Sequence, residues 1–405
     1  MLNEIENEPG LKPRLADRSL FPNLQYRAYL AHCSIAPISL PVQRRIGEAV
    51  ASYTRLGSAA FAEWLPYRTV LRERLARLSG AVAENIALVP NTTQGVLSVA
   101  LCFPWRQGDR VLSFCGEFPA NITPWQRAAE LYSLDLQLLP LERVPQPDVL
   151  GALSEALQDK SRGAVRLVAV SLVQFQSGLL MPIKEIAELC HRYGAALCVD
   201  GIQGLGVVEC QAKAWGVDFL ACGSHKWLMG AEGAGFLYIA EEWLPRLRQV
   251  MAGWLSHEHT FDFLSEPESG HLDYSRPLRR DATFVELGTG NTLGYLALEA
   301  STSILEELGR ENIYAHVCAY NDLLEAGLVQ RGFASLRSKP ASGILSVIPP
   351  AEGLNTAQWA AALGERGILC SNPDGLLRFA PHWHNSLDEV GYVLECVEAL
   401  QKRNR

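Results

Sequence analysis

An aspartate and a lysine follow two consecutive apolar stretches in the middle of the sequence. Residues 195–199 (AALCV) lead into Asp200, and residues 219–222 (FLAC) lead through small residues to Lys226. Short apolar runs of this kind are typical of buried strands. In an open α/β sheet, ligands bind beyond the carboxyl ends of the strands. We therefore expect the Asp200 carboxylate and the Lys226 amine to lie in one crevice.

An acid and an amine in one crevice suit pyridoxal 5′-phosphate. A lysine holds this cofactor as a Schiff base, and an acidic group lies opposite its pyridine nitrogen. The carboxylate favours the protonated ring, and the lysine, once displaced by the substrate amine, can move protons. Taken alone, Asp200 could be a turn residue and Lys226 a solvated surface side chain. Together they favour cofactor chemistry.

The motifs VDGIQGLG and GSHKWLMGAEGAGFLYI resemble the class V aminotransferase family, which includes cysteine desulfurases, kynureninases and isopenicillin N epimerase-like enzymes. The similarity runs from YLAHCSIAP at Tyr29 to RFAPHWHN at Arg378. It implies an α/β fold, fold type I of pyridoxal phosphate enzymes, with a mostly parallel seven-stranded sheet flanked by helices and a smaller α/β C-terminal domain. It also implies cofactor contacts: Asp200 at the ring nitrogen, Gln203 at the ring hydroxyl, Ser224 and His225 at the phosphate, and Lys226 at the aldehyde.

Four further residues are candidates for cofactor binding. Thr92 and Thr93 stand where a helix is expected to begin, and a helix start binds anions through its free N–H groups; the alternative is an ordinary N-cap. Phe118 stands where desulfurases carry a histidine that stacks on the ring, and a phenyl face can also stack. The family uses the position of Thr289 to reach the phosphate in the neighbouring subunit, which implies a homodimer with shared active sites; a helix cap is the alternative.

Arg378 and His32 are the candidates for substrate binding. Arg378 matches the family arginine that binds the substrate α-carboxylate through a bidentate pair. His32 lies in a loop that lines the site in family members, although a satisfied core histidine is the commoner outcome. Cys370 lies eight positions before Arg378 in an apolar run, GILCS. Burial there would leave its thiol inert, whereas a desulfurase needs a reactive thiol.

Phe118 and Cys370 therefore move the expected reaction away from desulfuration. The leading hypothesis is elimination of a β-substituent, of the C–S lyase type, from a small L-amino acid by way of an external aldimine and a quinonoid. An aminotransferase or epimerase uses the same residues up to that point, and a cysteine desulfurase remains a further alternative. A catalytically inactive protein that keeps the cofactor site as a scaffold is the alternative from another class.

Composition agrees with a soluble enzyme and excludes several other classes. The 405 residues are 48% hydrophobic with a net charge of −8, which argues against nucleic-acid binding. The ten cysteines have no paired spacing, the first residues are not typical of a secretory signal, and no apolar run approaches the roughly 20 residues of a membrane span. We expect a cytoplasmic protein. We also expect no metal site, because a site at either HxH pair (His257/His259 or His382/His384) needs a third ligand that the sequence does not indicate.

The expected elements divide the chain into three segments. These are an N-terminal arm at 1–28, a large cofactor-binding domain at 29–290, and a small C-terminal domain at 291–405 that includes the linking helix. Expected strands include 86–89, 110–114, 167–172, 235–239 and 344–348, and expected helices include 42–53, 67–79 and 182–193. A proline in the first turn and Gly194 after the last mark helix 182–193, which joins two strands in a parallel βαβ unit.

Overall fold

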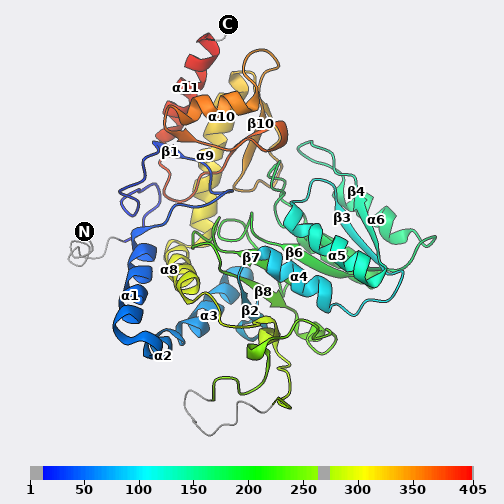
Figure 1. The fold of residues 1–405 in the computed structure, drawn as a ribbon. Helices are drawn as coiled ribbons and strands as arrows, with labels where there is room; N and C mark the ends of the chain where they lie inside the picture. Colours follow the sequence, from blue (N-terminus) through cyan, green and yellow to red (C-terminus); the bar gives the residue numbers. More distant parts are fainter. Residues whose placement is uncertain (1–11, 263–273, 404–405) are drawn as a thin grey trace.

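The computed structural model describes residues 12–262 and 274–403. The two largest hydrophobic cores of the described residues surround the central sheet (the large core) and a three-stranded sheet (the smaller core), which lie in separate parts of the molecule (Figure 1). The smaller core lies above the larger one in this view, and α9 (Arg310–Gln330) runs from one to the other. Two-domain arrangements of this kind commonly place binding sites where the domains meet.

The large core is built on a seven-stranded sheet in the order β2-β8-β7-β6-β5-β3-β4. Its strands are β2 (Ile86–Val89), β3 (Arg110–Phe114), β4 (Asp135–Leu139), β5 (Val165–Ser171), β6 (Ala196–Asp200), β7 (Phe219–Gly223) and β8 (Gly235–Ile239). Only β8 among these strands runs antiparallel to its neighbours β2 and β7. The other pairs, from β7 across to β4, are parallel, so their carboxyl ends open on one edge.

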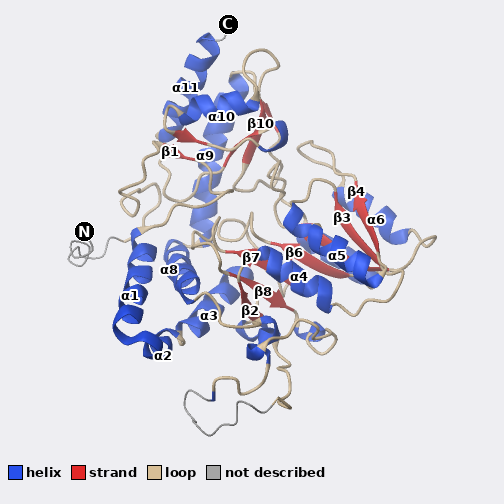
Figure 2. Ribbon diagram, viewed as in Figure 1, coloured by secondary structure: helices blue, strands red, loops and turns tan. Residues whose placement is uncertain are grey.

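The helices of the large core pack on this sheet or against one another (Figure 2). They are α1 (Leu40–Leu56), α2 (Ala60–Trp64), α3 (Tyr67–Ser79), α4 (Thr92–Cys102), α5 (Thr123–Tyr132), α6 (Val149–Gln158), α7 (Ile183–Arg192) and α8 (Thr292–Leu308). Helix α4 packs on β7 and β8, and α7 packs on β6. Strands β6 and β7 are buried on both faces, which explains why their sequences are continuously apolar.

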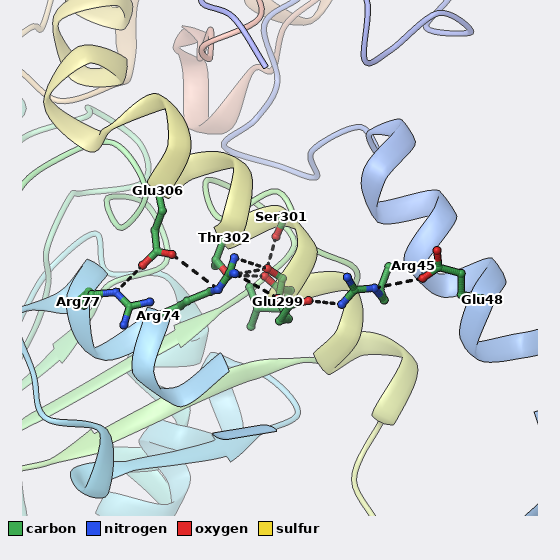
Figure 3. A network of polar contacts seen from close by, with 9 residues as sticks. Arg45, Glu48, Arg74, Arg77, Glu299, Ser301, Thr302 and Glu306 are labelled. Carbon is green, nitrogen blue, oxygen red and sulfur yellow. Dashed lines mark hydrogen bonds and ion pairs between the residues drawn. The ribbon is translucent and has the colours of Figure 1, made fainter. Parts of the chain in front are cut away.

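An ion-pair network joins α8 to α1 and α3 (Figure 3). The buried Glu299 carboxylate contacts Arg45 Nη1 and, at 3.5 Å, Arg74 Nη2. Glu306, two turns further along α8, pairs with Arg77 Nε at 2.7 Å and with Arg74 Nε at 3.6 Å. A buried carboxylate is tolerated when it is paired in this way. The network therefore fixes α8 against the large core.

The smaller core combines segments from both ends of the chain. Its elements are β1 (Ala28–Tyr29), β9 (Ala334–Ser335), β10 (Leu345–Ile348), α10 (Thr356–Gly364), β11 (Ile368–Leu369), β12 (Leu377–Phe379) and α11 (Glu389–Arg403). Strands β9, β10 and β12 form an antiparallel sheet, and β1 pairs in parallel with β11. Side chains early in α9 (Ile313, Val317) belong to the large core and later ones (Tyr320, Leu324) to the smaller one, so α9 is the helix that links them.

The predicted α/β architecture with a mostly parallel seven-stranded sheet is confirmed. The predicted bounds 86–89, 110–114, 235–239 and 67–79 agree with the structure, whereas helix 42–53 extends to Leu40–Leu56. The pairing of β1 with β11 places the end of the predicted arm in the smaller core, and residues 1–11 of that arm lie outside the described residues. In the described part of the chain, no helix is long and apolar enough to cross a membrane.

Candidate active site

The carboxyl ends of β6 and β7 open into a cavity of about 370 Å³. Asp200 is the last residue of β6, and Lys226 follows the end of β7 by three residues. The lining residues come from seven parts of the chain: Cys33, Ser34, Asn91, Thr92, Thr93, Phe118, Ala120, Phe175, Asp200, Ile202, Gln203, His225, Lys226 and Arg378. The expected crevice with an acid and an amine is therefore present.

The two charged groups at the strand ends retain bonding capacity that the chain does not use. Asp200 is 2% exposed, and its Oδ1 accepts a hydrogen bond from the Ile202 amide at 2.9 Å. Burial raises the pKa of Asp200 to about 6, against the lowering effects of that amide and of Lys226. Burial lowers the pKa of Lys226, while Asp200 opposes the shift. Lys226 Nζ forms no hydrogen bond with any described residue, so it is available to a ligand.

The start of α4 forms one wall of the cavity. Asn91 is the N-cap and accepts a hydrogen bond from the Gln94 amide at 2.8 Å. Thr92 Oγ1 accepts one from the Gly223 amide at 2.9 Å, which ties the helix start to the end of β7. The first N–H groups of a helix have no partner within it, so those of Thr92 and Thr93 can bind an anion. The wall combines the expected anion site with an asparagine cap that we did not predict.

His225, Ser224 and Gln203 lie around the lysine in different situations. His225 lines the cavity, and burial lowers its pKa. Ser224 is buried, donates its hydroxyl to the Ala231 carbonyl and does not line the cavity. Gln203 lines the cavity, donates to the Cys33 carbonyl at 2.9 Å and accepts from Trp227 Nε1 at 3.0 Å. One amide hydrogen of Gln203 thus remains for a ligand.

Arg378 reaches the cavity from β12 of the smaller core. Its Nε donates to Ser371 Oγ at 2.9 Å, and its Nη1 donates to the Phe175 carbonyl. The remaining nitrogen, Nη2, donates to no described residue. These two contacts hold the guanidinium in place and leave one edge for a carboxylate. The two domains therefore meet at this site.

Two phenylalanines form the opposite wall. The Phe118 ring is 45% exposed and packs edge-on against Phe175, with ring centroids 5.2 Å apart. Lys226 Nζ lies 5.4 Å from the centroid of Phe118. An exposed ring beside the reactive amine can cover a flat ligand.

Besides Ser224, the predicted site residues His32 and Thr289 lie outside this cavity, as does Cys370, which was expected to be buried. His32 is fully buried, with Nδ1 2.8 Å from the Ala380 carbonyl and Nε2 3.0 Å from His384 Nε2, and burial lowers its pKa to about 4. Thr289 lines a separate cavity of about 170 Å³. Cys370 follows β11, is buried, and has its pKa raised to about 12 by burial. None of the three contacts a ligand placed between Asp200 and Lys226 within this chain.

The HxH motifs do not form a metal site in the described residues. No group of three or more His, Cys, Asp or Glu side chains there is arranged to hold a metal ion. His382 and His384 are buried against His32, and His257 bonds to the Arg276 carbonyl at 2.8 Å.

Besides Asn91, sequence reasoning missed two further residues at this site. Cys33 lines the cavity, with Sγ 3.6 Å from Ser371 Oγ. Glu117 lies behind the cavity, where its Oε1 accepts from the Ser171 amide at 2.8 Å and Ser171 pairs with Asp200 across the sheet. Burial raises the pKa of Glu117 to about 7, against the lowering effect of its hydrogen bonds. The motifs LAHC and GEFPAN contain both residues, but neither shows which side chain faces the site.

Comparison with known proteins places this site in a family. The Aminotransferase class-V family matches residues 62–375. The chain is 28% identical to the uncharacterised aminotransferase YcbU of Bacillus subtilis (strain 168), over 94% of this chain and 96% of that protein. It is 26% identical to a probable cysteine desulfurase of Methanothermobacter thermautotrophicus, again over 94% and 96%.

Two solved structures share the fold. The apo structure of cysteine desulfurase from Thermococcus onnurineus NA1 has a TM-score of 0.81 at 24% identity and covers 93% of this chain and 95% of its own. The complex between the cystine C–S lyase C-DES and its reaction product cysteine persulfide has a TM-score of 0.84 at 23% identity, covering 93% and 98%. With its acid, amine and arginine in one cavity, the chain belongs to the class-V aminotransferase family and is a pyridoxal phosphate-dependent enzyme that acts on an amino acid.

Proposed function

We propose that the protein eliminates a β-substituent, most readily a sulfur group, from a small L-amino acid. The observation that carries the proposal is the meeting of Arg378, Lys226 and Asp200 in one cavity while the Cys370 thiol is buried outside it. A substrate α-carboxylate on Arg378 would bring the α-carbon toward Lys226. The wall near Phe118, Phe175 and Ala120 carries no charge, which suits a small uncharged side chain.

The residues present fit pyridoxal phosphate. A cavity of about 370 Å³ lies within the range typical of small-molecule sites. The unpaired Lys226 amine, the Asp200 carboxylate and the helix start at Thr92 and Thr93 match the aldehyde, the pyridine nitrogen and the phosphate. When bound, the cofactor supplies a ring that withdraws electrons from the substrate α-carbon.

Each residue has a defined task in this proposal. Asp200 holds the proton on the ring nitrogen, because its raised pKa still leaves it ionised at neutral pH and a nearby cation favours that form. Lys226 removes the α-proton, and burial, which lowers its pKa, keeps a fraction of the amine neutral for this purpose. Gln203 would contact the ring hydroxyl and His225 the phosphate, while Ser224 holds the loop that carries His225 through its bond to the Ala231 carbonyl.

We also propose a cytoplasmic homodimer. Thr289 lies outside the cavity of its own chain, which leaves it available to a neighbouring subunit's phosphate. All ten cysteines are free, as expected in a reducing compartment.

Desulfuration is the second candidate, and Cys33 is the observation that favours it. Its thiol lines the cavity, so a nucleophile for substrate sulfur is present even though Cys370 is buried. Several relatives carry the name probable cysteine desulfurase. Transamination, suggested by the name of the Bacillus subtilis relative, needs an oxo-acid acceptor that the elimination does not need.

The deciding experiment incubates the purified holoenzyme with a panel of L-amino acids that includes cysteine and cystine, with and without an oxo acid. Elimination yields an oxo acid, ammonia and the released sulfur species without any acceptor. Alanine with protein persulfide as the products would replace our proposal by desulfuration, and strict dependence on an oxo acid would replace it by transamination. No turnover of any amino acid would favour the scaffold hypothesis.

Two matched cysteine variants separate elimination from desulfuration. We expect Cys33→Ala and Cys370→Ala to retain oxo-acid formation within about threefold, because elimination needs no thiol nucleophile. Loss of sulfur transfer in Cys33→Ala alone, with Cys370→Ala unaffected, would identify Cys33 as the sulfur acceptor and overturn the elimination.

A further inference from the structure

The residue after Lys226 is a fully buried tryptophan whose indole N–H contacts a residue of the cavity wall. Trp227 is 1% exposed, and its Nε1 donates to Gln203 Oε1 at 3.0 Å. Gln203 lines the cavity, and its Nε2 donates to the Cys33 carbonyl at 2.9 Å. The proposed function places Gln203 at the ring hydroxyl of the cofactor and gives no task to Trp227.

These two hydrogen bonds fix the orientation of the Gln203 amide. An indole N–H can only donate, and a backbone carbonyl can only accept. The Trp227 contact therefore requires oxygen on one side of the amide, and the Cys33 contact requires nitrogen on the other. Because both partners demand the same orientation, the second hydrogen of Nε2 is the one that remains for a ligand in the cavity.

The indole N–H is what holds the oxygen end of this amide. Gln203 is 4% exposed, so its Oε1 has little access to water. Without the indole N–H, this buried oxygen would lose its partner in the described chain, and a buried acceptor without a partner is costly. The amide would then rotate to recover a hydrogen bond and would no longer hold its remaining hydrogen in one direction.

The smaller domain holds the indole in place from the other side. Gly343, just before β10, lies so close that a Cβ there would approach Trp227 Cη2 to 2.6 Å and Cζ3 to 2.7 Å. The Gly343 carbonyl accepts from Asn321 Nδ2 of α9 at 2.9 Å, which fixes that backbone. The Trp227 carbonyl accepts from His382 Nε2 at 3.0 Å. The indole is therefore confined between Gln203 and Gly343.

We propose that Trp227 is a positioning residue, which holds the Gln203 amide in the orientation that offers an N–H to the cofactor's ring hydroxyl. Trp227 does not line the cavity, so it acts through Gln203. The inference rests on the task proposed above for Gln203 and not on the elimination reaction.

The test titrates the apoprotein with pyridoxal 5′-phosphate and with its 3-deoxy analogue, which lacks the ring hydroxyl. Trp227→Phe should weaken binding of pyridoxal phosphate about tenfold and leave the affinity for the analogue unchanged. A purely structural role of the indole would weaken binding of both forms equally. Trp105→Phe is the matched control, because Trp105 is 2% exposed and donates to the Ala100 carbonyl at 2.7 Å, away from the cavity. It should change neither affinity.

Two further variants make the test independent of how well Trp227→Phe folds. Gly343→Ala keeps the indole N–H but displaces the ring, so it should reproduce part of the discrimination between the two cofactor forms. Gln203→Leu removes the amide itself. Adding Trp227→Phe to Gln203→Leu should cause no further loss of affinity, because residues that act through one contact are not additive.

The outcomes separate this inference from the assignment of Gln203. Discrimination between the two cofactor forms in Gln203→Leu, but in neither Trp227→Phe nor Gly343→Ala, would overturn the positioning role and leave the task of Gln203 in place. Equal losses for both forms in Gln203→Leu would overturn both assignments. Neither result bears on the elimination, which the amino-acid panel tests.

Discussion

Buried polar side chains gather in two neighbouring regions, and the regions differ in how far the chain itself satisfies them. One is the cavity with Asp200, Lys226 and Arg378. The other, the histidine cluster, consists of His32, His382 and His384. Trp227, the residue after Lys226, connects them, because its carbonyl lies 3.0 Å from His382 Nε2.

The histidine cluster is bonded almost entirely within the chain. His32 Nδ1 donates to the Ala380 carbonyl, so its Nε2 accepts from His384 Nε2. His382 Nδ1 accepts from the Trp383 amide at 2.8 Å, so its Nε2 donates to Trp227. Only His384 Nδ1 lacks a partner among the described residues. Neutral rings satisfy this pattern, and burial lowers the pKa of all three histidines.

The cavity shows the opposite situation. Lys226 Nζ and Arg378 Nη2 donate to no described residue. Polar groups with unused donors and acceptors lower stability unless a ligand takes them up, whereas satisfied groups serve structure. Burial and residue type alone would therefore not separate the two regions; the unused bonding capacity does.

The largest expected effect comes from Lys226→Ala, because Lys226 is the only lysine that lines the cavity. Borohydride reduction followed by intact-mass measurement should find cofactor attached to the wild type and none on the variant. The Lys226→Ala apoprotein should be at least as stable as the wild-type apoprotein, since the substitution removes a buried, unpaired amine. Cofactor still attached to the variant after reduction would rule out Lys226 as the anchor.

Arg378→Lys should have the next largest effect. A lysine keeps the charge but cannot form the bidentate pair, so kcat/KM for the best amino acid should fall about 100-fold, mainly through KM. Arg143→Lys is the matched control, because Arg143 donates to the Asp374 carbonyl at an exposed position. Equal KM values for Arg378→Lys and the control would show that Arg378 does not bind the substrate carboxylate.

The smallest effect concerns the pH dependence of stability. The pKa of His32 is about 4 in the folded protein against about 6.5 unfolded, so the unfolded chain binds the proton first as pH falls. The contribution of neutral His32 to the free energy of unfolding is complete above pH 6.5. This contribution decreases by about 3 kcal/mol as the pH falls toward 4. His32→Gln should therefore show a shallower loss of urea midpoint over this range.

His191 provides a control of opposite sign. Its pairing with Asp218 at 2.9 Å raises its pKa, so that contribution is present at low pH and is lost as pH rises through the folded pKa. His191→Gln should cost more stability at pH 5 than at pH 8. Parallel pH profiles for the wild type, His32→Gln and His191→Gln would contradict the assignment of neutral, satisfied rings to the histidine cluster.

Local sequence signals predicted the elements that carry the cofactor site. Strand β8 and helix α3 have the predicted bounds, and the acid at the end of β6 and the amine after β7 share a cavity as expected. Apolar runs that end in polar or small residues are signals within a single segment. The Asn91 N-cap was missed because Thr92 and Thr93, which follow it, are equally good candidates for the start of the helix.

Positions that depend on distant segments were not predictable in this way. The His32 side chain is of a type that could serve in a binding site. Its contacts with Ala380 and His384 place it in the histidine cluster instead. Cys33, next to it, lines the cavity instead. The sequence offers no signal for this alternation, since the loop around them has no regular period. The helix that links the cores is α9, whereas α8 is held in the large core by its own ion pairs to α1 and α3.

The sequence by itself determined the family, the cofactor and the two residues at the strand ends, because each is specified by a short contiguous motif. The tertiary structure agrees with the burial expected for Cys370 and brings Arg378 to the cavity as expected, but it alone decided that Cys33 lines the cavity and that His32 bonds to His384 outside it. These outcomes depend on contacts between residues far apart in the chain, where packing, and not local propensity, sets which polar groups find a partner.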